Sequence, residues 1–491
     1  MLPDCKIQKV HEIKSLLKKN NIVDALARAY EPFQLKSLCY PLDLLKTQGY
    51  PISVLMLTLL LLPFLGVDSI HGFSNGAYSH VFEGAKDCLY RLKNNEWINW
   101  RKLLYRFNKR YNELADKHMV KLSEEERKGM KPKYKCLTAD DSPVNHTGKT
   151  IEGISKVHDH SLKCTVLGFK LLVLGYFDGI NFRPLDFSLH REGQNRQRYR
   201  FGLPVRALKK QYRKIRAKLS AGYERFKELD RDKNSQLISM IKRALKHGYV
   251  PDYVLFDAWF CCEKTLKAIR LLRQGVIHIV AACKMGNAKY NYLSKEMSAG
   301  QILKTLRKVH KRKPKRCRLL GCYYYTVVVD YKGMEVKLFF VRYTKRSKWR
   351  LLLTTQTSLR FTQAMEIYAI RWSIEVFFKE VKQLLGIQKC ASRDFDAHIA
   401  HTTLTLIQYV MLSLHKRFSD YETIGGLFRA IRDQYIQATI AQRLWQIMIS
   451  ILTRLVQKIE CDMELVLQLI IHDNDFRQLF SGMVQLKVQD E

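Results

Sequence analysis

Residues Tyr253–Lys284, "YVLFDAWFCCEKTLKAIRLLRQGVIHIVAACK", decide the fold class of this chain. An apolar run, Tyr253–Phe260, is followed by a segment of helical period, Cys262–Gly275, and by a second apolar run, Val276–Lys284. Strand, helix and strand in this order predict two parallel strands joined by a helix. We therefore expect an α/β protein whose mixed sheet is flanked by helices.

Three short runs of β type precede this unit, beginning at Cys136: "CLTADDS", "TVLGFKLLVLGYFDG" and "INFRPLDFSLHRE". The "FDGIN" turn between the last two predicts a hairpin. Three antiparallel strands are the natural interpretation, and the strands of the Tyr253–Lys284 unit are expected to join them in parallel. Between the two groups lies the basic stretch "RALKKQYRKIRAKLSAGYERFKELDRDK", which we expect to be helical and exposed.

Acidic residues lie where two of these strands are expected to end. Asp140 and Asp141 close the first strand, and Asp257 closes the apolar strand that begins at Tyr253. Ligands bind outside the ends of neighbouring strands in open α/β sheets, so these acids are expected to converge. The alternative is structural, because Asp also caps helices and stabilises turns.

The segment Tyr368–Lys382, "YAIRWSIEVFFKEVK", predicts one amphipathic helix. Its apolar residues occupy one arc, while Tyr368, Arg371, Glu375, Lys379 and Lys382 fall near a single line. One acid is thus surrounded by cations. A solvated face with i,i+4 ion pairs is the plain explanation, and a site that needs a third carboxylate is the alternative.

The order of elements, with "ADDS", "FDAWF" and "YAIRWSIEVFFKEVK", resembles the DDE transposases of bacterial insertion sequences, which have an RNase H-like core. The subgroup with a Tyr-x2-Arg-x3-Glu-x6-Lys signature is the most similar, and Tyr368, Arg371, Glu375 and Lys382 match it in full. The resemblance covers roughly residues 136–389. The family pattern favours Asp141 over Asp140 as the first acid.

This resemblance implies that Asp141, Asp257 and Glu375 are catalytic and hold Mg²⁺ or Mn²⁺, with two ions bound. Tyr368, Arg371 and Lys382 would then bind DNA. The enzyme would hydrolyse phosphodiester bonds at the ends of its own element and join the 3′ ends to target DNA, in a cut-and-paste pathway. A homodimer on paired ends is the implied assembly. One departure concerns the tryptophan that precedes the family's "LLLT" strand: here Arg350 takes that place and Trp349 lies one residue earlier.

Fold and family resemblance together predict five regions. The sheet is expected to be interrupted by an inserted β-rich subdomain, and both ends of the chain are expected to be helical. The predicted boundaries are 1–135 for a helical DNA-binding region, 136–285 for the first part of the catalytic core, 286–355 for the inserted subdomain, 356–395 for the rest of the core with the Glu375 helix, and 396–491 for a helical C-terminal region.

Charge points to the same partner. The 491 residues include 84 Lys and Arg against 46 Asp and Glu, a net charge of +38. Such an excess predicts a polyanion as partner. Double-stranded DNA, as the terminal inverted repeats of the element and as target, fits it, and the basic runs "RALKKQYRKIRAK" and "RKVHKRKPKR" are the candidate backbone contacts.

Other locations and cofactors are disfavoured. The apolar segment Ile52–Val67 is too short to cross a bilayer and contains a proline, so a buried helix or helix pair is expected. The N-terminus lacks a signal-peptide core, so we expect a cytoplasmic, nucleoid-associated bacterial protein without membrane contact. The 12 cysteines are expected to be reduced thiols. The pairs "VHDH" (His158, His160) and "HIAH" (His398, His401) lack the companions of a zinc site.

Two rival functions remain. A domesticated or non-catalytic DNA-binding protein of the same fold would have lost a carboxylate, and none is missing here. A stand-alone RNase H-like nuclease would not need the extra helical regions or the inserted subdomain.

Overall fold

The structure is a computed structural model that describes residues 30–45, 48–76, 78–121, 133–160, 162–193, 199–419 and 421–433. The chain divides into two compact units, one formed by residues 1–31 and 426–491 and the other by Pro32–Gly425. The second unit contains the sheet and all candidate site residues, and it is the one treated below. Much of the predicted C-terminal helical region and the start of the predicted DNA-binding region lie outside the described residues.

The part of this unit that precedes the sheet is helical. Its apolar segment forms a buried helix that ends before Pro63, and no helix in the described residues is both long and apolar enough to cross a membrane. The longest of these helices lies beside the sheet, where buried Asn108 donates through Nδ2 to the carbonyl oxygen of Pro184, 2.9 Å away. The helices are α3 (Leu35–Asp43), α4 (Ile52–Leu61), α5 (Ile70–Ser74), α6 (Lys86–Lys93) and α7 (Trp100–Lys121).

The sheet has 12 strands in a mixed arrangement. They are β1 (Cys136–Asn145), β2 (Ser155–Asp159), β3 (Cys164–Phe177), β4 (Phe182–His190), β5 (Tyr253–Phe256), β6 (His278–Cys283), β7 (Lys289–Tyr292), β8 (Lys295–Ser298), β9 (Lys315–Cys317), β10 (Cys322–Asp330), β11 (Glu335–Arg342) and β12 (Arg350–Thr354). The strand β2 was not predicted.

The first part of the sheet has the predicted architecture. Its order is β4-β3-β1-β5-β6, in which β1, β3 and β4 are antiparallel neighbours while β5 and β6 run parallel to β1. The hairpin between β3 and β4 turns at the predicted "FDGIN", where the Asp178 N–H donates to the Asn181 carbonyl. The prediction of a mixed α/β fold with an RNase H-like core is therefore confirmed.

The core is divided between the two faces of this sheet. Odd-numbered residues of β1, such as Leu137 and Ala139, pack with α11 (Lys233–Lys246) and α12 (Glu263–Arg270). Even-numbered Cys136 packs with α14 (Phe361–Ala369) on the other face, since side chains alternate along a strand. Odd-numbered residues of β1 therefore face α11 and α12, and even-numbered residues face α14.

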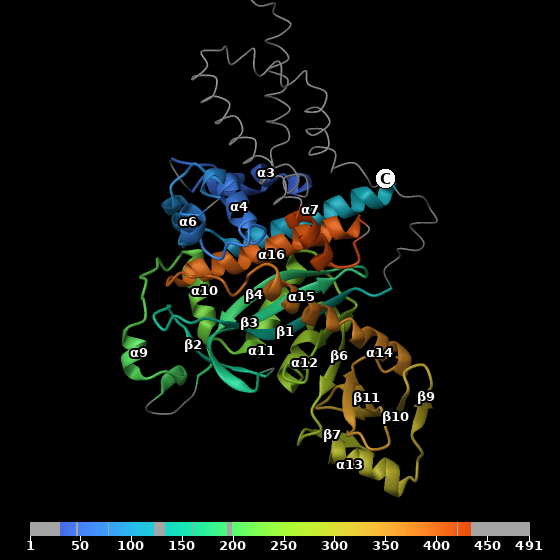
Figure 1. Ribbon diagram of the computed structural model, residues 1–491. Coiled ribbons are helices and arrows are strands. Elements are labelled where there is room, and N and C mark those ends of the chain that lie inside the picture. Colours follow the sequence, from blue (N-terminus) through green and yellow to red (C-terminus); the bar gives the residue numbers. More distant parts are fainter. Residues whose placement is uncertain are drawn as a thin grey trace, which may run out of the picture. The chain divides into compact units, whose positions relative to one another are not determined.

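Beyond β6 the sheet continues through β12, β11, β10, β7 and β8. The strands β7–β11 lie between β6 and β12 in the sequence, which places the strand-rich segment at one end of the sheet, together with α13 (Ala299–Lys304) (Figure 1). After β12 come α14, α15 (Trp372–Gln383) and α16 (Phe395–Arg417). Figure 1 shows α7 and α16 side by side, and both pack on β4.

The basic stretch between β4 and α11 differs from the predicted helix. Only α9 (Val205–Lys209), α10 (Ala221–Lys227) and a 3-10 turn at Glu228–Asp230 are helical, and residues 212–217 have no regular secondary structure. The reason is tertiary: Lys214 Nζ lies 2.7 Å from Asp396 Oδ2, and Arg216 Nη2 lies 2.6 Å from Glu152 Oε2. In a continuous helix these two cations would point away from Asp396 and Glu152, which are distant in the sequence and lie nearby only in the folded protein.

Candidate active site

The candidate acids on the sheet are brought together by strand register. Ala139 of β1 pairs with Phe256 of β5, and the two strands are parallel. The residues that follow this pair, Asp140 and Asp257, are therefore neighbours at the point where β5 ends. Burial and the negative charge of Asp257 raise the pKa of Asp140 to about 7. The strand register thus brings a β1 acid beside Asp257, as expected. The prediction that Asp140 and Asp141 close the first strand was wrong, because β1 continues to Asn145 in its pairing with β3.

Asp141 faces the other side of the sheet from Asp140. Its Oδ2 accepts from Lys233 Nζ at the start of α11, at 2.6 Å, and its Oδ1 lies 3.5 Å from buried Lys170 Nζ of β3. Asp140 instead forms an ion pair with Arg371, with 3.2 Å between Oδ2 and Nη1. Asp141, which was expected to be the first acid, therefore does not face Arg371. The adjacent residue, Asp140, does.

The helix expected over Tyr368–Lys382 is in fact two helices. The first, α14, ends at Ala369, and α15 begins at Trp372. The N–H groups of Ile370 and Arg371 bond three residues back instead of four, which tightens the chain between the helices. The prediction of one continuous helix was wrong at this point, and Arg371 lies at the junction.

From this junction Arg371 connects two candidate acids. Besides Asp140, its guanidinium binds the Glu375 carboxylate one turn further along the chain. The Tyr368 ring lies 5.6 Å from the Arg371 guanidinium carbon, and burial raises the pKa of the Tyr368 hydroxyl. Asp140, Asp257, Tyr368, Arg371 and Glu375 therefore form one cluster, in which charge is shared between the end of the sheet and α14–α15.

The two lysines of the predicted cationic line have different surroundings. Lys382 donates from Nζ to Ser142 Oγ at 2.8 Å, and burial lowers the pKa of its ammonium group. Ser142 lies on the same face of β1 as Asp140, two residues further along. Lys379 is exposed to solvent. Of these two lysines, Lys382 therefore packs against β1, and Lys379 faces solvent.

Trp349 is held by packing within the strand-rich segment. Its ring lies 5.3 Å from that of Tyr325 and 4.6 Å from the Arg342 guanidinium carbon, while Arg350 is exposed at the start of β12. Sequence reasoning did not single out Lys233 or Trp259. Lys233 lies 92 residues from Asp141, and no local pattern connects them. Trp259 was visible within "FDAWF", directly after a candidate acid.

The carboxylates have the donor chemistry for Mg²⁺ or Mn²⁺, since both ions prefer hard oxygen ligands. Burial and the negative charge of Asp257 raise the pKa of Asp140, and the positive charge of Arg371 opposes this rise. Among the described residues, no three His, Cys, Asp or Glu side chains are close enough together to hold a metal ion. The oxygen chemistry of these acids suits the ion, whereas their present arrangement places the Arg371 guanidinium between Asp140 and Glu375.

The histidine pairs have structural partners. His398 and His401 contact the backbone carbonyls of Ser392 and Gly386, each at 2.9 Å, and the rings of His158 and His160 lie edge to face. All ten cysteines in the described part of the chain are free thiols.

Comparison with protein families gives the decisive match. Residues 228–411 match the family described as "Transposase DDE domain". Over this segment the chain is similar to transposase DDE domains. It includes Asp257, Arg371 and Glu375, while Asp140 and Asp141 precede it.

Two further comparisons add little. No curated protein matches the chain. Among solved structures, the chain is similar to "Crystal structure of the NurA nuclease from Sulfolobus solfataricus", with 11% identity, a TM-score of 0.21 and coverage of 66% of this chain and 98% of that one. A likeness this weak carries no argument about fold or function.

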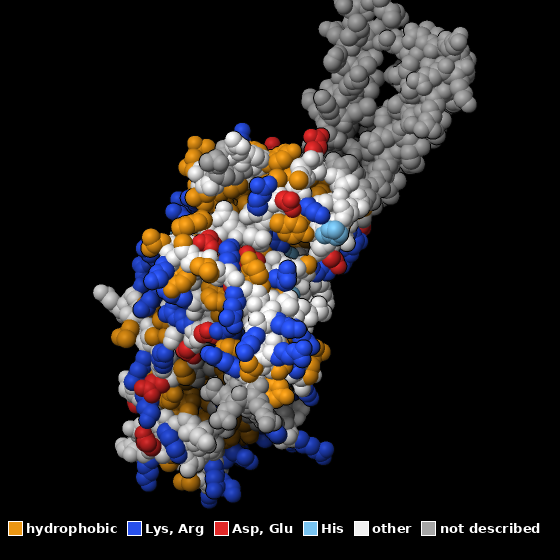
Figure 2. Space-filling view, turned by 90° about the vertical axis from the view of Figure 1, so that its left-hand side faces the viewer, with side chains coloured by type: hydrophobic (Ala, Val, Ile, Leu, Met, Phe, Trp, Pro, Cys, Tyr) orange, Lys and Arg blue, Asp and Glu red, His pale blue; other side chains and the backbone are white. Residues whose placement is uncertain are grey.

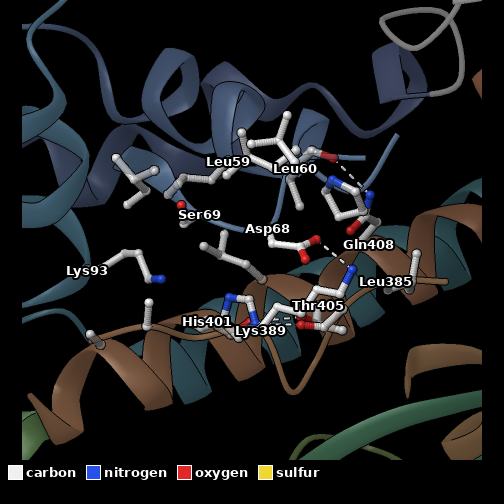
Figure 3. A pocket seen from close by; sticks show the side chains of 18 of the residues that line it. Leu59, Leu60, Asp68, Ser69, Lys93, Leu385, Lys389, His401, Thr405 and Gln408 are labelled. Atoms are coloured by element: carbon white, nitrogen blue, oxygen red, sulfur yellow. Dashed lines mark hydrogen bonds and ion pairs between the residues drawn. The ribbon is translucent and has the colours of Figure 1, made fainter. Parts of the chain in front are cut away.

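A cavity of about 110 Å³ lies elsewhere, between the helical region and the last helix of the DDE domain, α16 (Figure 3). Its wall is largely apolar, with Leu59, Leu60 and Leu385, and Gln408 is fixed there by a bond from its Nε2 to the Leu60 carbonyl. None of the candidate acids lines it. The candidate acids lie instead where β5 ends.

Proposed function

We propose that this protein is a DNA transposase of the Tyr-x2-Arg-x3-Glu-x6-Lys subgroup, encoded by a bacterial insertion sequence. It would cleave phosphodiester bonds at the ends of its element and join the freed 3′ ends to target DNA. One observation carries the proposal: Arg371 joins Asp140, 231 residues away in the sequence, to Glu375, beside the end of β5 where Asp257 lies. Asp140 and Glu375 thus share one guanidinium, and Asp257 lies beside Asp140, within and next to the segment that matches the transposase DDE domain.

We assign the first acid to Asp140. It shares Arg371 with Glu375 and lies beside Asp257, whereas Asp141 is occupied by Lys233 and Lys170 on the other face. A metal ion held by Asp140, Asp257 and Glu375, with two ions as the family pattern implies, would activate the attacking water and stabilise the leaving oxygen. Asp141 would then have a structural role, because it forms an ion pair with buried Lys170 of β3.

The cations of α14–α15 would position the DNA backbone. Arg371 presents a planar guanidinium that can bind two oxygens of one phosphate, and Lys382 and the Tyr368 hydroxyl can each donate to another. Binding of a phosphate would draw Arg371 away from Asp140 and Glu375, which frees those carboxylates for metal. The same side chain then serves the empty and the DNA-bound site.

Double-stranded DNA, as element ends and as target, is the proposed partner, bound by a homodimer. The net charge of +38 supports a polyanion, and Figure 2 shows Lys and Arg side chains outnumbering Asp and Glu over the face in view. The run "RKVHKRKPKR" after α13 exposes its lysines and arginines, so it remains a candidate backbone contact. In the run "RALKKQYRKIRAK", Lys214 and Arg216 form ion pairs within the protein, so they are not candidates for contacts to the DNA backbone.

The test uses linear DNA carrying the inverted repeats that flank the coding sequence, with Mg²⁺ present. We expect Asp140→Asn, Asp257→Asn and Glu375→Gln each to abolish strand cleavage while the protein still binds the ends. Asp141→Asn should lower the melting temperature, because it leaves buried Lys170 without its carboxylate, and the folded fraction should still cleave. An inactive, fully stable Asp141→Asn variant beside an active Asp140→Asn variant would return the first acid to Asp141. Cleavage by all the variants would refute the transposase.

A further inference from the structure

Two cysteine side chains lie against each other beside the ends of β5 and β6. The sulfur atoms of Cys261 and Cys283 are 2.9 Å apart, although the residues are 22 positions apart in the sequence. Cys283 is the last residue of β6, and Cys261 follows Asp257 in the segment between β5 and α12. Both side chains are half-buried against the core on the α11–α12 face of the sheet. The contact therefore joins the segment that carries Asp257 to the neighbouring strand.

The geometry of this pair is close to that of a covalent bridge. A disulfide has about 2.05 Å between its sulfur atoms, so Cys261 and Cys283 are about 1 Å from bonding distance. Hydrogen bonding with Cys261 and burial raise the pKa of the Cys283 thiol. Cys283 therefore keeps its proton and donates to Cys261, which is the sulfur free to react first. The adjacent Cys262 has a different partner, since its Sγ lies 3.3 Å from Thr265 Oγ1.

We propose that Cys261 and Cys283 are a site of reversible disulfide formation that reacts with low-molecular-weight disulfides. The Cys261 thiolate attacks one sulfur of the small disulfide, breaks its S–S bond and releases one thiolate, which takes up a proton. Cys283 then loses its proton, attacks the Cys261 sulfur of the mixed disulfide and releases the second small thiol. The protein is oxidised by two electrons, and the small disulfide is reduced to two thiols.

The effect of the bridge on activity rests on the proposed function. Asp140 and Glu375 share the Arg371 guanidinium in the present arrangement, so the acids have to rearrange before they can hold a metal ion with Asp257. A bridge from Cys261 to β6 would restrain the segment that follows Asp257. The disulfide form should therefore cleave DNA more slowly than the dithiol form.

The first experiment detects the bridge in the full-length protein without DNA or metal. The protein is incubated with oxidised glutathione, free thiols are blocked with N-ethylmaleimide, and the digested protein is analysed by mass spectrometry without reduction. We expect a peptide pair joined through Cys261 and Cys283, and recovery of both thiols after treatment with dithiothreitol. Because the bridge would close a loop across 22 positions, it should also raise the melting temperature.

Cys262→Ser is the matched control, because Cys262 is adjacent in the sequence but contacts Thr265. This variant should form the bridge as the wild type does, whereas Cys261→Ser and Cys283→Ser should not. Exposed Cys164 reports that the oxidant has acted, since it should be recovered as a mixed disulfide with glutathione. The site is overturned if Cys164 is modified while Cys261 and Cys283 remain free thiols, or if Cys261 is joined to Cys262 instead.

The second experiment compares DNA cleavage by the oxidised and the reduced protein. We expect oxidation to slow cleavage by the wild type about tenfold or more, since a displacement of about 1 Å in a catalytic group can cost about 10²-fold. Dithiothreitol should restore the rate, and Cys283→Ser should cleave equally fast before and after oxidant treatment. An unchanged rate in the bridged wild type would overturn the restraint on Asp257. If the bridge forms but the reduced wild type does not cleave, the disulfide site holds and the transposase does not.

Discussion

Replacing Arg216 by alanine should destabilise the protein strongly, although the residue lies in a run that looks like a DNA-binding surface. Arg216 is 8% exposed, and its guanidinium contacts three carboxylates. The closest atom pairs are 2.6 Å apart for Glu152, 3.1 Å for Asp396 and 3.5 Å for Asp394. Two of these acids lie at the start of α16, so the arginine connects this helix to the loop before β2.

The magnitude follows from what the substitution leaves behind. Removal of one partner from a buried ionic network costs about 3–5 kcal/mol, because the remaining charges are buried without compensation. Lys214 remains near Asp396 and offsets part of this loss. If each kcal/mol lowers the melting temperature by about 2 °C, Arg216→Ala should melt roughly 6–10 °C below the wild type in a thermal shift assay.

The pH dependence supplies a second test. Burial already raises the pKa of Asp394 and Arg216 opposes that rise, so loss of the arginine should raise it further. A carboxyl whose pKa is higher in the folded than in the unfolded state makes folding more favourable as pH falls. The stability difference between variant and wild type should therefore shrink as the pH is lowered from 7 towards the unfolded-state pKa, as the folded variant takes up protons.

Arg213→Ala is the control, since Arg213 belongs to the same basic run but is exposed. It should leave the melting temperature nearly unchanged, because surface charges contribute little. The reasoning is refuted if Arg216→Ala melts with the wild type and instead weakens DNA binding. That result would return the whole run to the DNA surface expected from its composition.

Further predictions concern catalysis, the core and DNA affinity. Arg371→Ala should lower the cleavage rate tenfold or more at an unchanged melting temperature, since it removes a phosphate contact worth at least about 1.4 kcal/mol at the transition state. Lys379 is exposed, and Lys379→Ala should lower the cleavage rate much less. Equal cleavage rates for the two variants would contradict the role of Arg371. Asp186→Asn should reduce stability by about 3–5 kcal/mol in urea unfolding, because the 1%-exposed carboxylate pairs with three arginines. Neutralising the cations of residues 311–315 should flatten the salt dependence of duplex binding by about 0.9 per lost phosphate contact, and an unchanged slope would remove this run from the DNA surface.

Local sequence determined most of the secondary structure around the site. The strands β1, β3, β4, β5 and β6 and the helices between them follow from apolar runs and turn residues, because burial of such runs selects their conformation. The aspartates of β1, the aspartate that follows β5, and the signature residues of α14–α15 were also visible in the sequence. These features depend on neighbours within a few residues.

Other features were decided by residues distant in the sequence. Periodicity cannot tell which of two adjacent aspartates faces Arg371, since that depends on which helical layer packs on each face of β1. The helix α14 lies on the side of Asp140, and α11 lies on the side of Asp141. It also cannot foresee that Lys214 and Arg216 leave a helical pattern to reach carboxylates at the start of α16. A buried charge without a partner costs more than a turn of helix contributes. The chain therefore adopts the backbone that its long-range ion pairs require.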